Sequence, residues 1–352
     1  PPIAANSRLV SAMSRVCVTG AAGFIASHVI TDLLEDGHVV HATVRDLGDD
    51  TKRAHLDVLK EGYSGKLELF GADLLEPGSL DAALEGCDAL IHTATAVILA
   101  APDPQKQIID VAVKGTQNVL DSVARAPSVN RIVMTSSIAA VMSYDQQDKT
   151  YTEDDWCTSD DIWLDPYGMG KTQSERLLWQ FVDKHADRVE AVAINPSVVI
   201  GPPLAKHHIR SSLSFIRDLV GWTYPACAPM RLHLVDVGDV SKGHVRALTS
   251  DKAVGQRIIF SDQQKSILEI SKVLSRQYKT PVRELPKLIL YIAAYLDKRF
   301  SLRLARASAN LHYEFGSDRP TELLGINLRN TEESILEAAE TMVEKGWVKP
   351  RS

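Results

Sequence analysis

The sequence lacks the features that mark several large classes of protein. Its 352 residues include only four cysteines, Cys17, Cys87, Cys157 and Cys227, and none of their spacings suits a zinc site, so we expect buried free thiols rather than disulfides. No apolar run approaches the roughly 18–20 residues that cross a bilayer. The formal net charge of -6 offers no basic field to a nucleic acid or a membrane surface. These absences predict a globular cytoplasmic protein of one large or two modest domains, without a metal, nucleic-acid or membrane partner.

Short β-branched runs alternate with helical stretches through the first half of the chain. The apolar runs are Val16–Thr19, Val39–Val44, Leu67–Phe70, Ala89–Thr93, Ile132–Thr135 and Val189–Ile194. Stretches of helical periodicity between them include Ile25–Glu35, Ile108–Ala124 and Ser174–Lys184. Strands separated by helices imply right-handed crossovers, so the pattern predicts an α/β Rossmann fold, a doubly wound parallel sheet with helices on both faces.

The alternation breaks after Pro196, and this break predicts a second, smaller lobe. A later helical stretch is followed by the strand-like run Arg257–Phe260, which we expect to rejoin the sheet. The predicted parts are a disordered extension at 1–14, a Rossmann domain at 15–195 together with 236–262, and an interleaved α/β substrate lobe at 196–235 and 263–352.

A glycine-rich turn follows the first predicted strand and opens the first predicted helix. Gly20 permits a tight turn, Gly23 allows close approach of the backbone to a pyrophosphate, and the small Ala26 allows close packing of helix on strand. The helix N-terminus, with Phe24 and Ile25, then presents N–H groups and a positive dipole end to phosphates. Although any strand-to-helix turn favours glycine, this position in the chain favours dinucleotide binding.

The second predicted strand ends in Arg45 rather than in an acidic residue. An acid would bind the ribose hydroxyls of NAD, whereas a guanidinium suits the 2′-phosphate of NADP. Lys52 and Arg53 follow shortly afterwards and could be ordinary surface charges. We favour NADP(H) as the cofactor, with Asp46 as the competing candidate for a ribose-binding acid.

Tyr167-Gly-Met-Gly-Lys171 places a phenol and an ammonium four residues apart, on one face of a helix. A free tyrosine has a pKa of about 10. A neighbouring ammonium should lower this pKa and make the phenol a better group for proton transfer. Ser137 ends the Thr135-Ser-Ser137 run after the fifth strand, where its hydroxyl could hold a substrate carbonyl oxygen. The combination predicts a catalytic triad of Ser137, Tyr167 and Lys171.

These motifs resemble the extended short-chain dehydrogenase/reductase superfamily, and most of all its dihydroflavonol reductases, cinnamoyl-CoA reductases and fungal methylglyoxal/aldehyde reductases. The resemblance runs from Val16 to about Val348. Besides the segments already named, it is carried by Gly71-Ala-Asp73-Leu74, Gly86-Cys-Asp-Ala-Leu-Ile-His-Thr-Ala94-Thr95, Asn195-Pro196-Ser-Val-Val-Ile-Gly-Pro202 and Val235-Asp236-Val-Gly-Asp239.

The resemblance implies a role for each matching residue. It assigns catalysis to Ser137, Tyr167 and Lys171, the last also contacting the nicotinamide ribose. The other implied cofactor contacts are Gly20, Gly23, Phe24 and Ile25 at the pyrophosphate, Arg45 and Lys52 at the 2′-phosphate, Asp73 and Leu74 at the adenine, Thr93, Ala94, Thr95 and Thr135 at the strand ends, and Pro196 and Val199 at the carboxamide.

The substrate pocket is less clearly marked. Plant dihydroflavonol reductases carry an asparagine five residues after the catalytic serine, where this chain has Met142, so we expect an apolar pocket rather than flavonoid specificity. Val97 and Trp222 are further candidates for its lining. His207 and His208 lack a third metal ligand and read as loop residues. The acidic residues around Glu153 read as a solvated loop.

The first functional hypothesis is an NADPH-dependent carbonyl reductase in which Tyr167 donates the proton. The alternatives are a nucleotide-sugar epimerase or dehydratase, a 3β-hydroxysteroid-type dehydrogenase, and a redox-sensing NADPH binder without catalysis. We expect a small-molecule carbonyl or alcohol as substrate and a monomer or homodimer as the assembly. The physiological substrate and the product stereochemistry are not encoded in these motifs.

Overall fold

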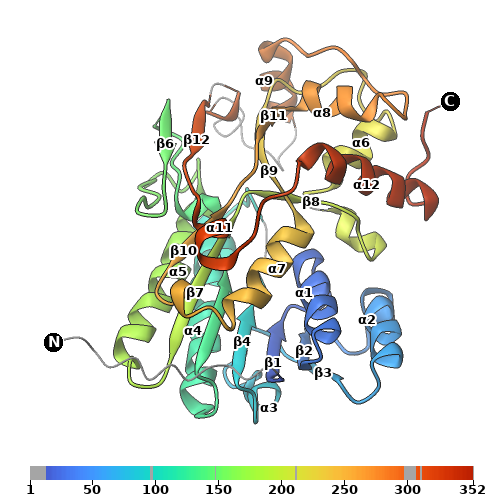
Figure 1. Ribbon diagram of the computed structural model, residues 1–352. Helices are drawn as coiled ribbons and strands as arrows, with labels where there is room; N and C mark the ends of the chain where they lie inside the picture. The colour runs from blue at the N-terminus through green and yellow to red at the C-terminus, as the bar shows by residue number, and fades with distance from the viewer. Residues whose placement is uncertain are drawn as a thin grey trace.

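The computed structural model contains one large parallel sheet, which positions every predicted catalytic residue (Figure 1). It describes residues 13–95, 98–146, 148–210, 212–296, 307–309 and 311–351. In sheet order the seven strands are β10 (Arg257–Phe260), β7 (Glu190–Pro196), β5 (Arg131–Thr135), β4 (Ala89–His92), β1 (Arg15–Thr19), β2 (Val39–Val44) and β3 (Leu67–Gly71). All neighbours run parallel, which confirms the predicted doubly wound Rossmann sheet.

Helices cover both faces of this sheet, as the continuous apolar runs of its strands require. One face carries α1 (Phe24–Glu35), α2 (Asp50–Gly62) and α7 (Val237–Ala247), and the other carries α3 (Asp81–Leu84), α4 (Asp110–Arg125) and α5 (Pro166–Lys184), as Figure 1 shows. Buried side chains of α1 and α7 share one apolar cluster with β1 and β2. Those of α4 and α5 share a second cluster with β5. A π-helical turn, η1 (Gln105–Ile109), leads into α4.

The strand order reverses between β1 and β4, because β1 is followed by β2 on one side and β4 lies on the other. Ligands of open parallel sheets bind beyond the carboxyl ends of the strands at such a reversal. The predicted glycine turn follows β1, and the predicted Thr93–Thr95 segment follows β4. These two groups of expected cofactor contacts therefore lie at the reversal. The predicted return of Arg257–Phe260 is also confirmed, since β10 pairs with β7.

Much of the rest of the chain forms a smaller lobe above the sheet, seen at the top of Figure 1, whereas α11 (Arg319–Leu324) packs beside the sheet against β10 and α7. A buried apolar cluster with members such as Ile216, Ile270 and Ile335 holds this lobe together. The elements outside the main sheet are η2 (Ile138–Ala140), β6 (Lys149–Tyr151), β8 (Val198–Ile200), η3 (Lys206–Arg210), α6 (Ser214–Val220), β9 (Arg231–Asp236), η4 (Asp251–Ala253), β11 (Gln264–Ser266), α8 (Ile267–Leu274), α9 (Lys287–Leu296), β12 (Tyr313–Phe315), α11 (Arg319–Leu324) and α12 (Thr331–Glu344).

The short strands of the lobe were not predicted from the sequence. β8, β9 and β11 form a three-stranded mixed sheet, and β6 pairs in parallel with β12. The proposed division into a Rossmann domain and a substrate lobe stays a prediction. Residues 1–12 of the expected extension lie outside the described part of the chain, while Ser14 is buried and its carbonyl accepts a hydrogen bond from the Val39 N–H.

The four cysteines are free and buried, as predicted. No helix among the described residues combines the length and the apolar character that a membrane crossing requires.

Candidate active site

Ser137, Tyr167 and Lys171 meet beyond the carboxyl end of β5. Ser137 follows this strand by two residues and begins the turn η2, where its Oγ accepts a hydrogen bond from the Ala139 N–H at 3.1 Å. Tyr167 and Lys171 lie one turn apart on α5. The Ser137 side chain is close enough to the Tyr167 phenol to act on its pKa, and Lys171 Nζ donates to the Thr135 carbonyl oxygen at 3.0 Å. Residues from β5, from the turn η2 and from the helix α5 thus converge on one point.

The start of α5 is defined by local sequence. Asp165 is the N-cap and accepts from the Gly168 N–H at 2.9 Å, and Pro166 occupies the first turn, where its missing N–H is harmless. A Cβ at Gly168 would collide with the Asp165 carboxylate, so a residue without a side chain is needed there. The glycine inside the Tyr-x-x-x-Lys motif therefore permits the cap that places Tyr167 in the first turn.

The environment of Tyr167 keeps its phenol protonated. Partial burial raises the pKa of Tyr167 to about 12; the Ser137 hydrogen bond opposes this rise and the nearby Asp165 charge adds to it. Lys171 is turned toward the Thr135 carbonyl and does not contribute. The prediction that Lys171 lowers the Tyr167 pKa is therefore wrong for this arrangement. A neutral phenol is nevertheless the form that can donate a proton.

Lys171 is itself buried, with 3% of its surface exposed. Burial lowers the pKa of Lys171 to about 8, against the opposing attraction of Glu175. His92 lies near it, and burial followed by the Lys171 charge lowers the pKa of His92 to about 3. The His92 ring is bonded to the Thr19 hydroxyl at 2.8 Å. At neutral pH, Lys171 thus carries most of its charge beside a neutral imidazole.

A second histidine, His244 of α7, supports the carboxyl end of β5 from the opposite face of the sheet. His244 on α7 bonds the Thr135 hydroxyl through Nε2 at 2.7 Å and the Val240 carbonyl through Nδ1 at 2.8 Å. Because the Val240 carbonyl can only accept, Nδ1 carries the proton and Nε2 accepts from Thr135. Burial lowers the pKa of His244 to about 4. Thr135 is thereby fixed through its side chain while its carbonyl holds Lys171.

The glycine turn has the features that a dinucleotide pyrophosphate needs. Gly20 has a φ of +70°, and a Cβ there would lie 2.9 Å from Ala94 Cα, so two requirements exclude a side chain. Gly23 is the N-cap of α1, has no side-chain cap, and is followed by a first turn without acidic residues. The N-terminus of α1 therefore fits an anion. Phe24 and Ile25 in this turn are half-buried against the core.

The turn is tied to the end of β4. The Thr93 hydroxyl donates to the Thr19 carbonyl, and the Ala94 N–H donates to the Thr19 hydroxyl at 3.1 Å. Thr95, the next predicted contact, is exposed. These bonds place the two predicted cofactor segments side by side.

The segment after β2 carries one unpaired and two paired cations. Arg45 is exposed and makes no hydrogen bond or ion pair within the described residues. Lys52 Nζ lies 2.8 Å from the Asp49 carboxylate, and Arg53 pairs with acidic residues of its own helix. The Asp46 carboxylate accepts from the Gly48 N–H at 2.8 Å, so it closes a local turn. Arg45 is thus the cation left available for a ligand.

The remaining predicted cofactor contacts follow other strands of the sheet. The Asp73 carboxylate accepts from the Leu75 N–H at 2.9 Å, and the carbonyl of Leu74 accepts from the Asn118 amide at 2.8 Å. Pro196, at the end of β7, and Val199, in β8, are buried. All four residues lie in or directly after strands β3, β7 and β8.

The two predicted substrate residues that the structure describes, Met142 and Trp222, lie in separate surroundings. Met142 is 4% exposed in a small cluster with Ile138, Val141 and neighbours from β6 and β10. The Arg351 guanidinium lies over the Trp222 ring, with its Cζ 4.2 Å from the ring centroid. Val97 lies outside the described residues. The assignment of these three side chains to a substrate pocket stays a prediction.

The histidines of the lobe contact the glycine turn. Nε2 of His207 and Nε2 of His208 lie 2.8 and 3.2 Å from the Ala22 carbonyl oxygen, and their rings pack against His55. Across the described part of the chain, no three His, Cys, Asp or Glu side chains are placed to share a metal ion. These histidines therefore join lobe and turn through hydrogen bonds.

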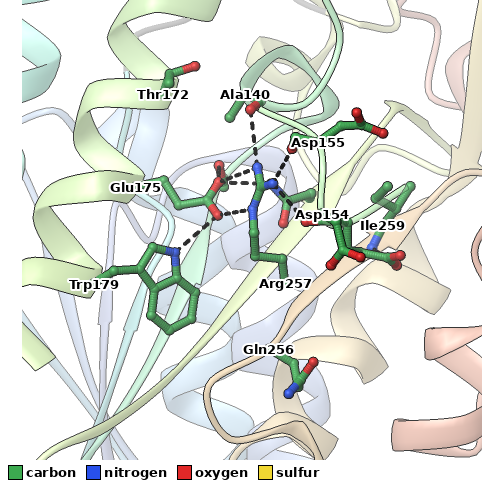
Figure 2. Close-up of polar contacts among 12 residues, drawn as sticks. Ala140, Asp154, Asp155, Thr172, Glu175, Trp179, Gln256, Arg257 and Ile259 are labelled. Carbon is green, nitrogen blue, oxygen red and sulfur yellow. Dashed lines mark hydrogen bonds and ion pairs between the residues drawn. The ribbon is translucent and has the colours of Figure 1, made fainter. Parts of the chain in front are cut away.

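A buried charged cluster that the motifs do not indicate lies beside the triad, where Glu175 of α5 meets Arg257 of β10 (Figure 2). Part of the acidic loop is also buried. Glu153 is 4% exposed, and its carboxylate accepts from the Ile259 N–H at 3.1 Å and pairs with Arg319. The expectation of a wholly solvated loop is wrong at Glu153 because its partners come from remote parts of the chain.

The sequence matches the model of the 3-beta hydroxysteroid dehydrogenase/isomerase family over residues 17–258. It is 37% identical over 283 residues to the cinnamoyl-CoA reductase CAD2 of Medicago truncatula, an alignment covering 77% of this chain and 82% of that relative. The dihydroflavonol 4-reductase of Arabidopsis thaliana is 30% identical over 348 residues, covering 97% and 85% of the two chains.

A solved structure of Gre2 from Candida albicans in complex with NADPH superimposes with a TM-score of 0.78 at 26% identity, covering 94% of this chain and 99% of that one. Together these matches confirm the predicted resemblance to reductases of the extended superfamily.

Proposed function

The chain belongs to the 3-beta hydroxysteroid dehydrogenase/isomerase family of extended short-chain dehydrogenases/reductases and is an oxidoreductase; on this premise we propose that it reduces an aldehyde or ketone with NADPH. The observation that carries the proposal is the convergence of Ser137, Tyr167 and the buried Lys171 beyond the carboxyl end of β5, where Lys171 is held by the Thr135 carbonyl. A carbonyl reduction needs a proton donor and a hydrogen bond to the same oxygen, and these two hydroxyls supply both.

Each residue of the triad has a separate task. The Ser137 hydroxyl donates a hydrogen bond to the substrate carbonyl oxygen, and Tyr167 transfers its proton to that oxygen as the alcohol forms. Lys171 is anchored on the Thr135 carbonyl, and its remaining N–H groups would hold the ribose of a bound cofactor and stabilise the phenolate left on Tyr167. Bound NADPH supplies the hydride for the carbonyl carbon.

Arg45 supports NADPH over NADH. Its guanidinium is exposed and without a protein partner in the described residues, at the end of β2 where the 2′-phosphate of such cofactors lies. Asp46, the competing acid, is engaged by the Gly48 N–H. The Gre2 relative, whose structure contains NADPH, supports the same choice.

The direct test is a substrate panel with each cofactor. NADPH and NADH consumption would be followed by absorbance with methylglyoxal, aromatic aldehydes, aryl ketones, β-ketoesters, a dihydroflavonol and cinnamoyl-CoA. We expect turnover of at least one carbonyl compound with a preference for NADPH. Turnover of a nucleotide sugar with copurified NAD, or of a 3β-hydroxysteroid with NAD⁺ alone, would replace the proposal by one of the alternatives.

A further inference from the structure

Helix α5 carries a further charged residue in line with Tyr167 and Lys171. Glu175 follows Tyr167 by eight residues and Lys171 by four, so the three side chains occupy one face of the helix. The Glu175 side chain is completely buried. A buried carboxylate is strongly disfavoured unless hydrogen bonds and a cation compensate its charge. The surroundings of Glu175 therefore need an explanation.

The compensating cation is Arg257 of β10, shown in Figure 2. Its Nε donates to Glu175 Oε1 at 2.5 Å and its Nη2 to Oε2 at 3.4 Å. The guanidinium also donates to the carbonyls of Ala140, Glu153 and Asp155. It lies over the Trp156 ring, 3.8 Å from the centroid. Arg257 is thus held on every side and cannot follow Glu175 if the carboxylate moves.

Besides a hydrogen bond that Oε1 accepts from Trp179 Nε1 at 3.3 Å, the remaining bonds of the carboxylate lead to Ser137. Glu175 Oε2 accepts from the Ser136 hydroxyl at 2.5 Å and from the Asn195 amide at 2.9 Å. Ser136 directly precedes Ser137, and the same Asn195 amide donates to the Ser137 carbonyl at 3.2 Å. One carboxylate oxygen therefore holds the backbone of Ser137 from both sides, through a covalent neighbour and through a shared amide.

The charge of Glu175 also acts on Lys171, one helical turn away. Burial alone drives the Lys171 ammonium toward the neutral amine, and the negative charge of Glu175 opposes this change. His92 on β4 also lies near Lys171 and is neutral at pH 7, and the Tyr167 phenol on the same helix stays protonated. Glu175 is therefore the nearest source of negative charge that keeps Lys171 protonated.

We propose that Glu175 is a positioning residue for the carbonyl reduction: clamped by Arg257, its carboxylate fixes the Ser137 backbone through Ser136 and Asn195 and lies one helical turn from Lys171. This inference rests on the proposed function for its effect on turnover. Its structural part, the link between Glu175 and Lys171, holds whatever the substrate is.

The test variant is Glu175→Gln, which keeps the size of the side chain and removes its charge. We expect kcat at pH 7 to fall about 10- to 100-fold, as for a small displacement of catalytic groups, with the Kd for NADPH changed less than about threefold. The alkaline limb of the pH profile should move to lower pH. Glu190→Gln is the matched control, because Glu190 pairs with Arg131 at the amino end of β5, away from the triad; its kcat and pH profile should match those of the wild type.

Because Glu175→Gln leaves Arg257 as a buried unpaired cation, the double variant Glu175→Gln/Arg257→Met is needed as well. It removes both charges, so the fold no longer contains an uncompensated ion. We expect it to fold and to retain the loss of kcat. Wild-type kcat in this folded double variant would overturn the inference.

An NMR titration measures the link to Lys171 without any turnover. In protein labelled at lysine Cε, the Lys171 signal is assigned by its loss in Lys171→Arg, and in the wild type it should titrate with a pKa of about 8. In Glu175→Gln the midpoint should fall by about one pH unit, and in Glu190→Gln it should not move. Equal midpoints in Glu175→Gln and the wild type would overturn the inference. If the wild type reduces no carbonyl compound, the proposed function fails, and this titration still decides the role of Glu175.

Discussion

Two arginines of the central sheet each pair with a glutamate, in different surroundings. Arg131 begins β5, and its Nη2 lies 2.8 Å from the Glu190 carboxylate, whose side chain is 38% exposed. Arg257 begins β10, and its Nε lies 2.5 Å from the Glu175 carboxylate, whose side chain is 0% exposed. Water can solvate Glu190 without its arginine, whereas Glu175 has no such alternative.

The two pairs therefore have different consequences for the fold. Buried ion pairs often add little net stability, because desolvation offsets the attraction, yet the loss of one partner is strongly destabilising. The Arg131 pair joins the start of β5 to β7 and to the carbonyls of Ala247 and Ser250. The Arg257 pair instead lies next to the residues proposed for catalysis. We infer that position in the site, rather than stability, accounts for the buried pair.

The largest expected effect comes from removing each arginine in turn. Arg257→Met should lower the free energy of unfolding by about 3–5 kcal/mol, because it leaves a buried carboxylate unpaired. Arg131→Met should lower it by about 1–2 kcal/mol, mainly through the carbonyls that lose their donor. Urea denaturation followed by circular dichroism measures both. Equal losses would remove the distinction between the two pairs.

The next largest effect is expected from Tyr167→Phe, which changes the proposed proton donor and leaves both arginine–glutamate pairs intact. Tyr167→Phe removes the proton donor and leaves Glu175, Arg257 and the Arg131 pair in place, so carbonyl turnover should fall at least about 100-fold. NADPH binding, measured by fluorescence titration, should be retained, and the free energy of unfolding should change by less than about 1 kcal/mol. Turnover near the wild-type rate would show that another group donates the proton.

A third carboxyl extends the comparison, since Asp165 is buried but has no cationic partner among the described residues. Burial raises the pKa of Asp165 to about 7, against the hydrogen bonds from the Gly168 N–H and from Cys157. Between pH values of about 4 and 7 the native state then binds more protons than the unfolded state, so the stabilising contribution of the protonated form is complete below about pH 4 and is lost as the pH rises to 7.

Asp165→Asn should remove this pH dependence, because asparagine can keep the N-cap of α5 without a charge. The variant should gain roughly 1–2 kcal/mol relative to the wild type between pH 5 and pH 8, measured as the difference between the two denaturation series. Parallel stability curves for variant and wild type over this pH range would contradict the assignment.

The smallest effect concerns an arginine at the opposite extreme, exposed and unpaired. Arg45→Glu should raise the KM for NADPH about tenfold or more, by loss of a charge-assisted contact to the 2′-phosphate, and change the KM for NADH much less. Lys60→Glu, which reverses an exposed charge near the end of α2, is the matched control. A similar rise for both cofactors would remove the argument for NADP(H).

The sheet could be predicted because most of its strands are apolar runs, which can be recognised without knowing which strands they pair with. β2 and β10 have the predicted bounds, and the glycine turn lies where its spacing indicates. The three-residue strands β6, β8, β11 and β12 could not be found, because such short segments carry no periodicity and are defined by their partners.

The buried charges were missed for a related reason. In the sequence, Glu153 and Glu175 look like ordinary surface residues. Their partners, Arg319 for Glu153 and Arg257 for Glu175, are far away in the sequence and reach them only in the folded chain. The pKa of Tyr167 was predicted in the wrong direction because the motif gives the spacing of Lys171 but not the direction of its ammonium, which points to the Thr135 carbonyl. Sequence spacing therefore places Tyr167 and Lys171 on one helix face but does not give the direction of either side chain.

The most direct measurement for the proposed function is a crystal structure of the protein with NADPH and a substrate carbonyl compound. We expect the Tyr167 and Ser137 hydroxyls within hydrogen-bond distance of the carbonyl oxygen, the Lys171 ammonium at the ribose, and the pyrophosphate at the N-terminus of α1. A complex in which the nicotinamide lies away from β5 and the Tyr167 phenol faces solvent would contradict the account.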